Sequence, residues 1–218
     1  MSPGEPEVRL EGGGRVVDRL TARAGEEVNL ECVSEGGNPP PLLSWRVGGS
    51  NLEATLVQED VMLPGGTWRS ISRLRLPVSR EDNGGSVECY LEHPALEVSP
   101  ATAISLEIFY PPRITVQTDL PDPLVEGGSV SLSCEVDANP PARVQWRRLG
   151  SPVGVLGGSS GSVVGTSSLL VLDPVRKEDG GSYQCSAENE LGLAKPQAVH
   201  LNVLCKYPNF ITYLQNFQ

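Results

Sequence analysis

The sequence predicts an all-β fold made of two sandwiches, each built from two antiparallel sheets. Three observations predict it: one short motif occurs twice, each half holds a Cys, Trp, Cys frame, and apolar residues alternate with polar ones in short segments. Residues two apart on an extended strand point to the same face, so this alternation is typical of strands with one buried face. With 218 residues, the chain can form two domains of about 100 residues each.

The repeated motif reads KEDGGSYQC at residues 177–185 and REDNGGSVEC at residues 80–89. In the later copy, four residues follow one another at intervals of two: Asp179, Gly181, Tyr183 and Cys185. This spacing places the tyrosine and the cysteine on one face of a strand. The earlier copy keeps the cysteine but lacks the tyrosine; counted back from the cysteine, its matching residues are Asn83, Gly85, Val87 and Cys89.

Each half also holds a tryptophan between two cysteines at similar spacing: Cys32, Trp45 and Cys89, then Cys134, Trp146 and Cys185. Between the first cysteine and the tryptophan, both halves contain an Asn-Pro-Pro turn, which ends one strand and reverses the chain before the next. The frame describes a sandwich in which two cysteines join the sheets across a buried tryptophan.

Further alternating or apolar segments, each bounded by Gly, Pro or Ser, supply the other strands. In residues 26–32 and 128–136, Val, Leu and Cys share one face and Ser, Asn or Glu the other. The 24 glycines and 19 prolines suit short strands joined by tight turns, and no segment has a sustained helical stripe. The remaining predicted strands are residues 70–76, 86–91 and 103–109, then 143–146, 167–172, 182–187 and 198–203.

Charge and side-chain chemistry exclude several classes of function. The net charge of −10 is spread over both halves without a Lys/Arg cluster, which argues against nucleic acid or an anionic membrane as the partner. The only two histidines, His93 and His200, lie in different halves, so a metal cluster or catalytic triad lacks its components. The glycine-rich residues 154–165 lack the lysine of a phosphate-binding loop. We therefore expect no enzyme activity, no cofactor and no metal.

The Cys, Trp, Cys frame resembles the immunoglobulin superfamily, and the motif around Tyr183 resembles that family's signature before its second cysteine. The resemblance implies two tandem immunoglobulin-like sandwiches of the C2 or I type, and a stiff linker between them is expected to stack them end to end. It also implies that the hydroxyl of Tyr183 bonds to the backbone at a sheet corner and that Asp179 braces the preceding turn. Trp45 and Trp146 would fill the two cores, beside the disulfides Cys32–Cys89 and Cys134–Cys185.

A narrower resemblance, over about residues 5–204, is to adhesion receptors of the nephrin and Kirrel type, with sidestep-like receptors and nectins as relatives. It is carried by the segments GGNPPPLLSW, VDANPPARVQW, REDNGGSVEC and LEIFYPPR. The expected domains are residues 1–109 and 113–204, joined by a short, stiff Tyr-Pro-Pro linker at 110–112. Residues 205–218 are expected to form an irregular tail. Its Cys205 is expected to stay free, with an intermolecular disulfide as the alternative.

The resemblance implies a cell-surface adhesion or recognition module that binds another immunoglobulin-domain protein, homophilically or heterophilically, through a sheet face. The sequence contains neither a secretory signal nor a membrane span, yet paired cysteines suit an oxidising compartment, so we expect a fragment of a larger receptor ectodomain. An intracellular structural array and a soluble immune receptor remain as alternatives. Candidate partner-binding residues are Arg46 and Tyr90 in the first domain and Gln145, Arg147 and Gln184 in the second.

Overall fold

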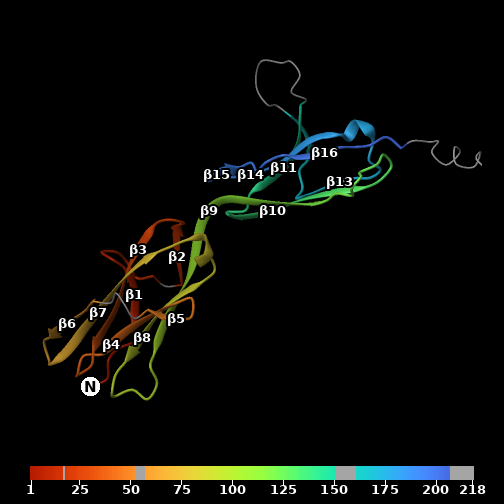
Figure 1. The fold of residues 1–218 in the computed structure, drawn as a ribbon. Coiled ribbons are helices and arrows are strands. Elements are labelled where there is room, and N and C mark those ends of the chain that lie inside the picture. Colours follow the sequence, from red (N-terminus) through yellow and green to blue (C-terminus); the bar gives the residue numbers. More distant parts are fainter. Residues whose placement is uncertain (17, 53–56, 151–160, 207–218) are drawn as a thin grey trace, which may run out of the picture. The chain divides into compact units, whose positions relative to one another are not determined.

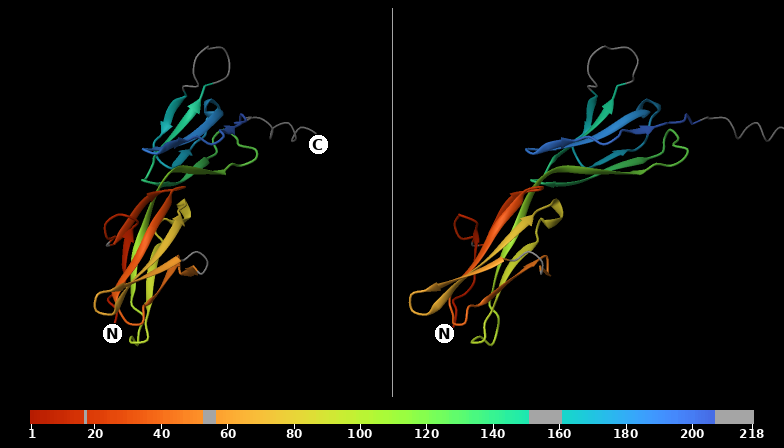
Figure 2. Two further views of the ribbon diagram at one scale, coloured as in Figure 1. Left: turned by 90° about the vertical axis from the view of Figure 1, so that its left-hand side faces the viewer. Right: turned by 60° about the vertical axis from the view of Figure 1, so that its left-hand side comes forward.

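The computed structural model describes residues 1–16, 18–52, 57–150 and 161–206. It divides into two compact domains, Met1–Tyr110 and Pro111–Gln218. Each domain is a sandwich of two β-sheets, which confirms the predicted all-β fold (Figures 1 and 2). Of the predicted tail, residues 207–218 lie outside the described residues.

The first domain packs a four-stranded sheet against a second sheet of comparable size. The first sheet is antiparallel, in the order β1-β3-β7-β6, with β1 at Glu7–Leu10, β3 at Glu27–Gly36, β7 at Thr67–Pro77 and β6 at Val57–Leu63. The second runs in the order β9-β8-β4-β5, with β9 at Ala101–Asp119, β8 at Ser86–Glu92, β4 at Leu42–Val47 and β5 at Ser50–Leu52. Strand β2 (Arg19–Arg23) pairs with β9 in parallel.

The second domain repeats this plan with fewer described strands. One sheet joins the later part of β9 to β10 (Val130–Asn139) and β13 (Leu169–Leu172). The other has the order β12-β11-β14-β15, and β16 also pairs with β14; its strands are β12 (Ser162–Gly165), β11 (Arg143–Leu149), β14 (Gly181–Asn189), β15 (Gly192–Ala194) and β16 (Val199–Leu201).

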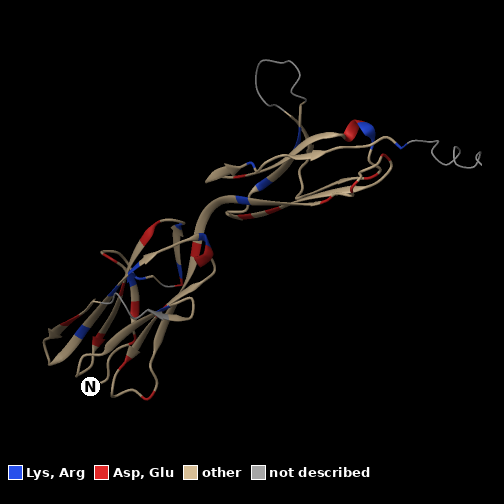
Figure 3. Cartoon of the chain, in the orientation of Figure 1, with Lys and Arg blue, Asp and Glu red and all other residues tan. Residues whose placement is uncertain are grey.

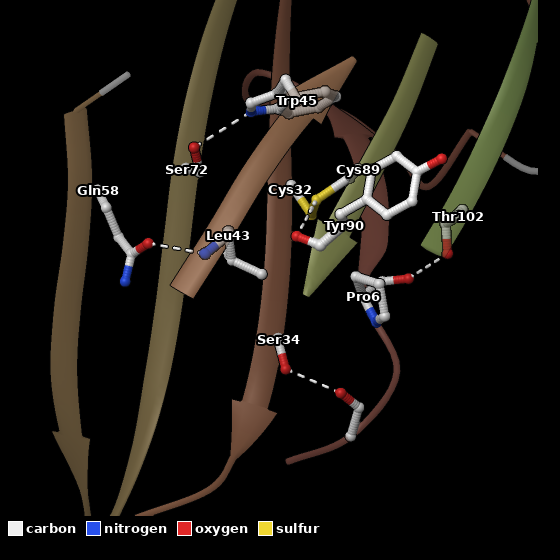
Figure 4. The surroundings of a disulfide bond; sticks show 11 residues. Pro6, Cys32, Ser34, Leu43, Trp45, Gln58, Ser72, Cys89, Tyr90 and Thr102 are labelled. Carbon is white, nitrogen blue, oxygen red and sulfur yellow. Dashed lines mark hydrogen bonds between the residues drawn. A yellow bond between two sulfur atoms is a disulfide. The ribbon is translucent and has the colours of Figure 1, made fainter. Parts of the chain in front are cut away.

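A disulfide and a tryptophan lie at the centre of each core. Cys32 of β3 bonds to Cys89 of β8, and Cys134 of β10 bonds to Cys185 of β14, with Cα–Cα distances of 6.3 and 6.4 Å. Both predicted disulfides are thereby confirmed, and each one joins the two sheets of its sandwich. The tryptophans stand opposite the second cysteines, in the register pairs Trp45–Cys89 and Trp146–Cys185, and both side chains are fully buried. Figure 4 shows Trp45 and the disulfide of the first core.

The segment expected to link the domains is strand. Residues 110–112 lie within β9, and the side chain of Tyr110 is buried in the first core. The guanidinium of Arg80 lies 4.9 Å from the centre of the Tyr110 ring, a cation–π distance. Tyr110 therefore belongs structurally to the first sandwich.

Polar side chains close the open edge of the first sandwich. Among the described residues, β5 pairs with residues 45–47 of β4, and none pairs with the first half of β4 on that side. The amide of Gln58 on β6 bonds to this part of the chain: its oxygen accepts from the Leu43 N–H at 3.0 Å (Figure 4), and its nitrogen donates to the Pro41 carbonyl at 2.9 Å. The indole N–H of Trp45 on β4 also donates to the hydroxyl of Ser72 on β7, at 3.1 Å.

In the second domain, the repeated motif forms a short 3₁₀ turn, η2 (Lys177–Asp179), followed by β14. The Asp179 carboxylate accepts from the backbone N–H of Arg176 at 2.7 Å, and the Tyr183 hydroxyl donates to the Asp179 carbonyl at 2.8 Å. Arg148 of β11 adds hydrogen bonds from its Nη2 to the carbonyls of Glu178 and Gly180. Burial raises the pKa of Tyr183, and the Arg148 charge opposes that rise.

The first domain builds the same turn one residue earlier in the motif. In η1 (Arg80–Asp82) the Asp82 carboxylate accepts from the Ser79 N–H at 2.7 Å, so Asp82 is the counterpart of Asp179. Counting back from the cysteine had matched Asn83 instead. Asn83 is an added residue, and its side-chain oxygen accepts from the Ile108 N–H of β9 at 2.9 Å. Val87, fully buried, stands where the second domain has Tyr183.

The geometry of the second core sets an order of mutational costs. Tyr183→Phe should lower the free energy of unfolding by about 1 to 2 kcal/mol, because the Asp179 carbonyl loses its donor. Trp146→Ala should cost about 3 to 5 kcal/mol, because it opens a cavity beside the disulfide. Denaturant titration of both variants and the parent chain measures the two costs. The reverse order would contradict this assignment of the core.

Candidate functional site

The β9-β8-β4-β5 sheet of the first domain presents one face of alternating side chains to solvent. The inward positions, such as Trp45 and Cys89, are buried. The register places Ser44 opposite Tyr90 and Arg46 opposite Glu88 on neighbouring strands. Next to them on β9 stand the small, exposed side chains of Ala101 and Ala103. Small residues on β9 leave the taller side chains of β4 and β8 accessible from that side.

Arg46, Glu88 and Tyr90, which we call the Arg46 cluster, make a connected polar group on this face. The Arg46 guanidinium lies 4.5 Å from the centre of the Tyr90 ring, and its Nη1 donates to the Tyr90 hydroxyl at 2.7 Å. That hydroxyl donates to Glu88 Oε2 at 2.5 Å, and Arg46 Nη1 lies 3.9 Å from the same oxygen. The ring and the two charged groups therefore hold one another in place while remaining partly exposed.

The charge distribution of the cluster favours the neutral phenol. The Glu88 carboxylate, by accepting the hydroxyl's hydrogen bond, raises the pKa of Tyr90; partial burial acts in the same direction, and the Arg46 charge opposes both. The neutral hydroxyl therefore stays the donor that connects the ring to Glu88.

Sequence reasoning selected Arg46 and Tyr90 but missed Glu88. The sequence could have revealed Glu88, because it precedes Tyr90 by two residues on the same strand and so shares its face.

The candidate residues of the second domain lie on its β11 and β14 strands and are less tightly connected. Arg147 stands opposite Gln184, and its Nη2 lies 3.5 Å from the side-chain oxygen of Gln145, a marginal hydrogen bond. The Gln184 amide instead donates to the Pro196 carbonyl at 2.8 Å. Gln184 is thus held by its own domain, and the structure brings together only Arg147 with Gln145 by direct contact.

The opposite face of the first domain, on β1-β3-β7-β6, carries several ion pairs. Arg73 bridges Glu31 at 2.9 Å and Glu59 at 3.1 Å, across three neighbouring strands. Arg69 pairs with Glu35 at 3.4 Å. Val33, which alternation places on the outer face, is only 3% exposed, whereas Val57 and Val61 of the edge strand β6 are 70% and 43% exposed. Ion pairs therefore hold several charges of this face, and apolar side chains stay exposed along its β6 edge.

In the part of the chain that the structure describes, no group of three or more His, Cys, Asp or Glu side chains could hold a metal ion. Lys and Arg are interspersed with Asp and Glu along the strands (Figure 3). Among the same residues, no helix has the length and apolar character needed to cross a bilayer.

Family models match both domains. Residues 6–100 match the CD80-like C2-set immunoglobulin domain, and residues 111–189 match the immunoglobulin domain. The chain belongs to the immunoglobulin superfamily. Its relatives there include cell adhesion molecules, and none of the matches indicates an enzyme family.

Human cell adhesion molecule 3 is 32% identical over 184 residues, which is 81% of this chain and 43% of that protein. Human myelin-associated glycoprotein is 33% identical over 171 residues, which is 78% of this chain and 26% of that protein. The ectodomain structure of mouse nectin-like molecule 4 has a TM-score of 0.70 and 27% identity, over 93% of this chain and 65% of that one. The chain thus spans less than half the length of these curated relatives.

The Arg46 cluster of the first immunoglobulin domain can be tested by titration. Glu88→Gln should lower the pKa of Tyr90, because the neutral amide no longer favours the protonated phenol as the carboxylate does. Alkaline titration followed by phenolate absorbance measures this, and Tyr90→Phe identifies which of the five tyrosines contributes the affected step. Superimposable curves for Glu88→Gln and the parent chain would show that Glu88 does not hold the Tyr90 hydroxyl.

Proposed function

We propose that this chain is the recognition part of a cell-surface adhesion receptor, and that the β9-β8-β4-β5 face of its first domain binds another immunoglobulin-domain protein. The similarity to cell adhesion molecule 3 and to nectin-like molecule 4 supports a function in adhesion. Two disulfides support an oxidising, extracellular location. The chain would act as part of a longer ectodomain.

The observation that carries the proposal is the contrast between the two faces of the first domain. The Arg46 cluster offers a partly exposed aromatic ring and guanidinium, residue types enriched at binding hot spots, beside small residues on β9. The opposite face instead has several of its charged side chains joined in ion pairs. The sequence also contains no Asn-x-Ser/Thr site, so no N-glycan would cover either face.

A sheet face suits a partner that presents a surface of the same kind. Its side chains stand in rows across a nearly flat area, which a second sheet can cover but a small ligand would leave mostly exposed. We therefore take another immunoglobulin domain, of the same or a different protein, as the partner. The second domain serves mainly as a spacer, and Gln145, Arg147 and Gln184 form a weaker candidate face.

The narrower assignment to receptors of the nephrin and Kirrel type is part of this proposal. It is supported by the Asn-Pro-Pro turns of both domains and by the Tyr-Pro-Pro step at residues 110–112. These turn sequences determine how the strands are joined. The partner would instead be selected by the side chains of the exposed sheet face.

Binding should depend on the Arg46 cluster. Arg46→Glu places a carboxylate beside Glu88 and removes the cation over the Tyr90 ring, so we expect a loss of at least about tenfold in affinity. The chain, displayed as a multivalent fusion, is screened against cell-surface ectodomains, since the affinity of a single contact should be only about micromolar. The affinities of the parent chain and of Arg46→Glu for the partner found in the screen are then measured by surface plasmon resonance with monomeric protein.

A matched charge reversal on the other sheet controls for net charge. Arg75→Glu changes an exposed arginine of β7 and should leave binding unchanged. Loss of binding with Arg147→Glu but not with Arg46→Glu would move the site to the second domain. Binding to glycans alone, or turnover of a substrate that survives repurification, would refute the proposal.

A further inference from the structure

A short segment in front of β8 continues the pairing of that strand with β9. The Gly84 N–H donates to the Leu106 carbonyl at 2.9 Å, and the Leu106 N–H donates to the Gly85 carbonyl at 2.9 Å. The side-chain oxygen of Asn83 accepts from the Ile108 N–H at 2.9 Å. These three hydrogen bonds bind the segment to β9, and one of them depends on a side-chain amide.

Asn83 is the one asparagine of the sequence that is followed by glycine. In such a pair the backbone nitrogen of the glycine can attack the side-chain carbonyl carbon of the asparagine, because glycine has no side chain to hinder the approach. Asn83 and Gly84 are both exposed, and a Cβ placed on Gly84 would meet no atom of the described residues within 4 Å. Water can therefore reach this peptide bond, and ammonia can leave it.

The native conformation holds the reacting atoms apart. Ring closure requires the Gly84 nitrogen to eclipse the Asn83 Cβ across the Cα–C bond, whereas the Asn83 ψ of 126° turns that nitrogen well away. The nitrogen must also lose the proton that it donates to the Leu106 carbonyl, and the side-chain carbonyl must turn from the Ile108 N–H. The ring can therefore close only when the segment comes away from β9.

We propose that Asn83 is a deamidation site and that the pairing of its segment with β9 controls the rate of the reaction. When the segment opens, the deprotonated nitrogen of Gly84 attacks Asn83 Cγ, and the bond from Cγ to the side-chain nitrogen breaks. The side-chain NH2 group takes up the proton that Gly84 lost and leaves as ammonia, and a five-membered succinimide remains. Water then opens this ring at either carbonyl and yields aspartate or isoaspartate.

The two products differ in their effect on the pairing. Aspartate keeps a side-chain oxygen that can accept from the Ile108 N–H, and it adds a negative charge. Isoaspartate routes the main chain through Cγ, which inserts a methylene group in front of the Gly84 nitrogen. The acceptor at residue 83 and the donor of Gly84 then no longer match the spacing of Ile108 and Leu106. Isoaspartate should therefore loosen the segment that precedes β8.

The inference concerns the covalent chemistry of the first domain, so it can be tested before any partner is known. The full chain is kept at neutral pH below its unfolding temperature, and the peptide that contains residue 83 is followed by mass and by chromatography. The same chain, reduced and unfolded in guanidinium chloride, gives the reference rate. We expect the folded chain to deamidate at least about tenfold more slowly, because opening breaks several hydrogen bonds. Equal rates would contradict control by the fold.

Two variants remove the same brace from the two domains. Asp82→Ala removes the carboxylate that accepts from the Ser79 N–H, so the turn in front of the segment loosens, and deamidation of Asn83 in the folded chain should accelerate. Asp179→Ala removes the counterpart brace of the second domain and should leave that rate unchanged. Equal acceleration by both variants, or none by Asp82→Ala, would contradict the proposed control.

Hydrogen exchange measures the opening on the unmodified chain and covers the case in which Asp82→Ala fails to fold. The Gly84 N–H is released by the same opening that deamidation requires, so its protection factor should have the same order of magnitude as the slowing of deamidation. The isoaspartate form, separated by chromatography, should melt several degrees below Asn83→Asp, which keeps the acceptor. Deamidation of the folded chain faster than the opening of Gly84 allows, or identical melting of these two forms, would overturn the proposal.

Discussion

The covalent link between the two sheets, packed against a tryptophan, is the constraint on which both domains depend. Each sandwich has only about 100 residues, and aromatic residues make up 5% of the chain, so the cores have few large side chains to bury. A disulfide that closes a loop of about 50 residues contributes roughly 4 kcal/mol in the chain-entropy model. Cys89 and Cys185 stand directly opposite Trp45 and Trp146, so the strand that carries one end of each disulfide lies beside the strand that carries the largest fully buried side chain of that core. The register of β4 with β8, and so the placing of Arg46 opposite Glu88, follows from this packing.

The sequence predicted those strands in which every second residue is apolar and buried. Strands β3, β7, β8 and β10 were recognised because Val, Leu or Cys residues stand two apart on their inward face, as Leu74 and Leu76 do on β7. Strand β6 was missed for a physical reason, since the residues it pairs with Ser72 and Ser70 are Gln58 and Asp60, whose side chains form hydrogen bonds where an apolar residue would otherwise stand. The sequence of β6 therefore lacks the alternation of apolar and polar residues by which the other strands were predicted. The short strands β1 and β2 were missed because β1 has only one buried residue and β2 only two.

For the candidate site too, the sequence shows which face of a strand a residue lies on, but not which residues of other strands it contacts. Alternation placed Arg46 and Tyr90 on an outer face, but it gives no information on which neighbours they touch. That Glu88 completes the cluster depends on the β4–β8 register and on side-chain reach across strands, which only coordinates supply. The turn before β14 gives a further case. Counting from a cysteine matched Asn83 with Asp179, whereas the hydrogen bonds match Asp82, because the added residue is absorbed between the turn and the strand.

Arginine and glutamate occur on both faces of the first domain, but their contacts differ. On β1-β3-β7-β6, arginines and glutamates alternate across strands and neutralise one another, so docking there would have to break existing pairs and dehydrate charges. On β4 and β8, one arginine lies over an aromatic ring, and part of its binding energy comes from a ring face that remains in place when a partner approaches. Docking removes water from charged groups on either face, but the cation–π contact of Arg46 strengthens as water is removed and stays in place. The chemistry of the residues, more than the area of either sheet, therefore favours the face that holds the Arg46 cluster.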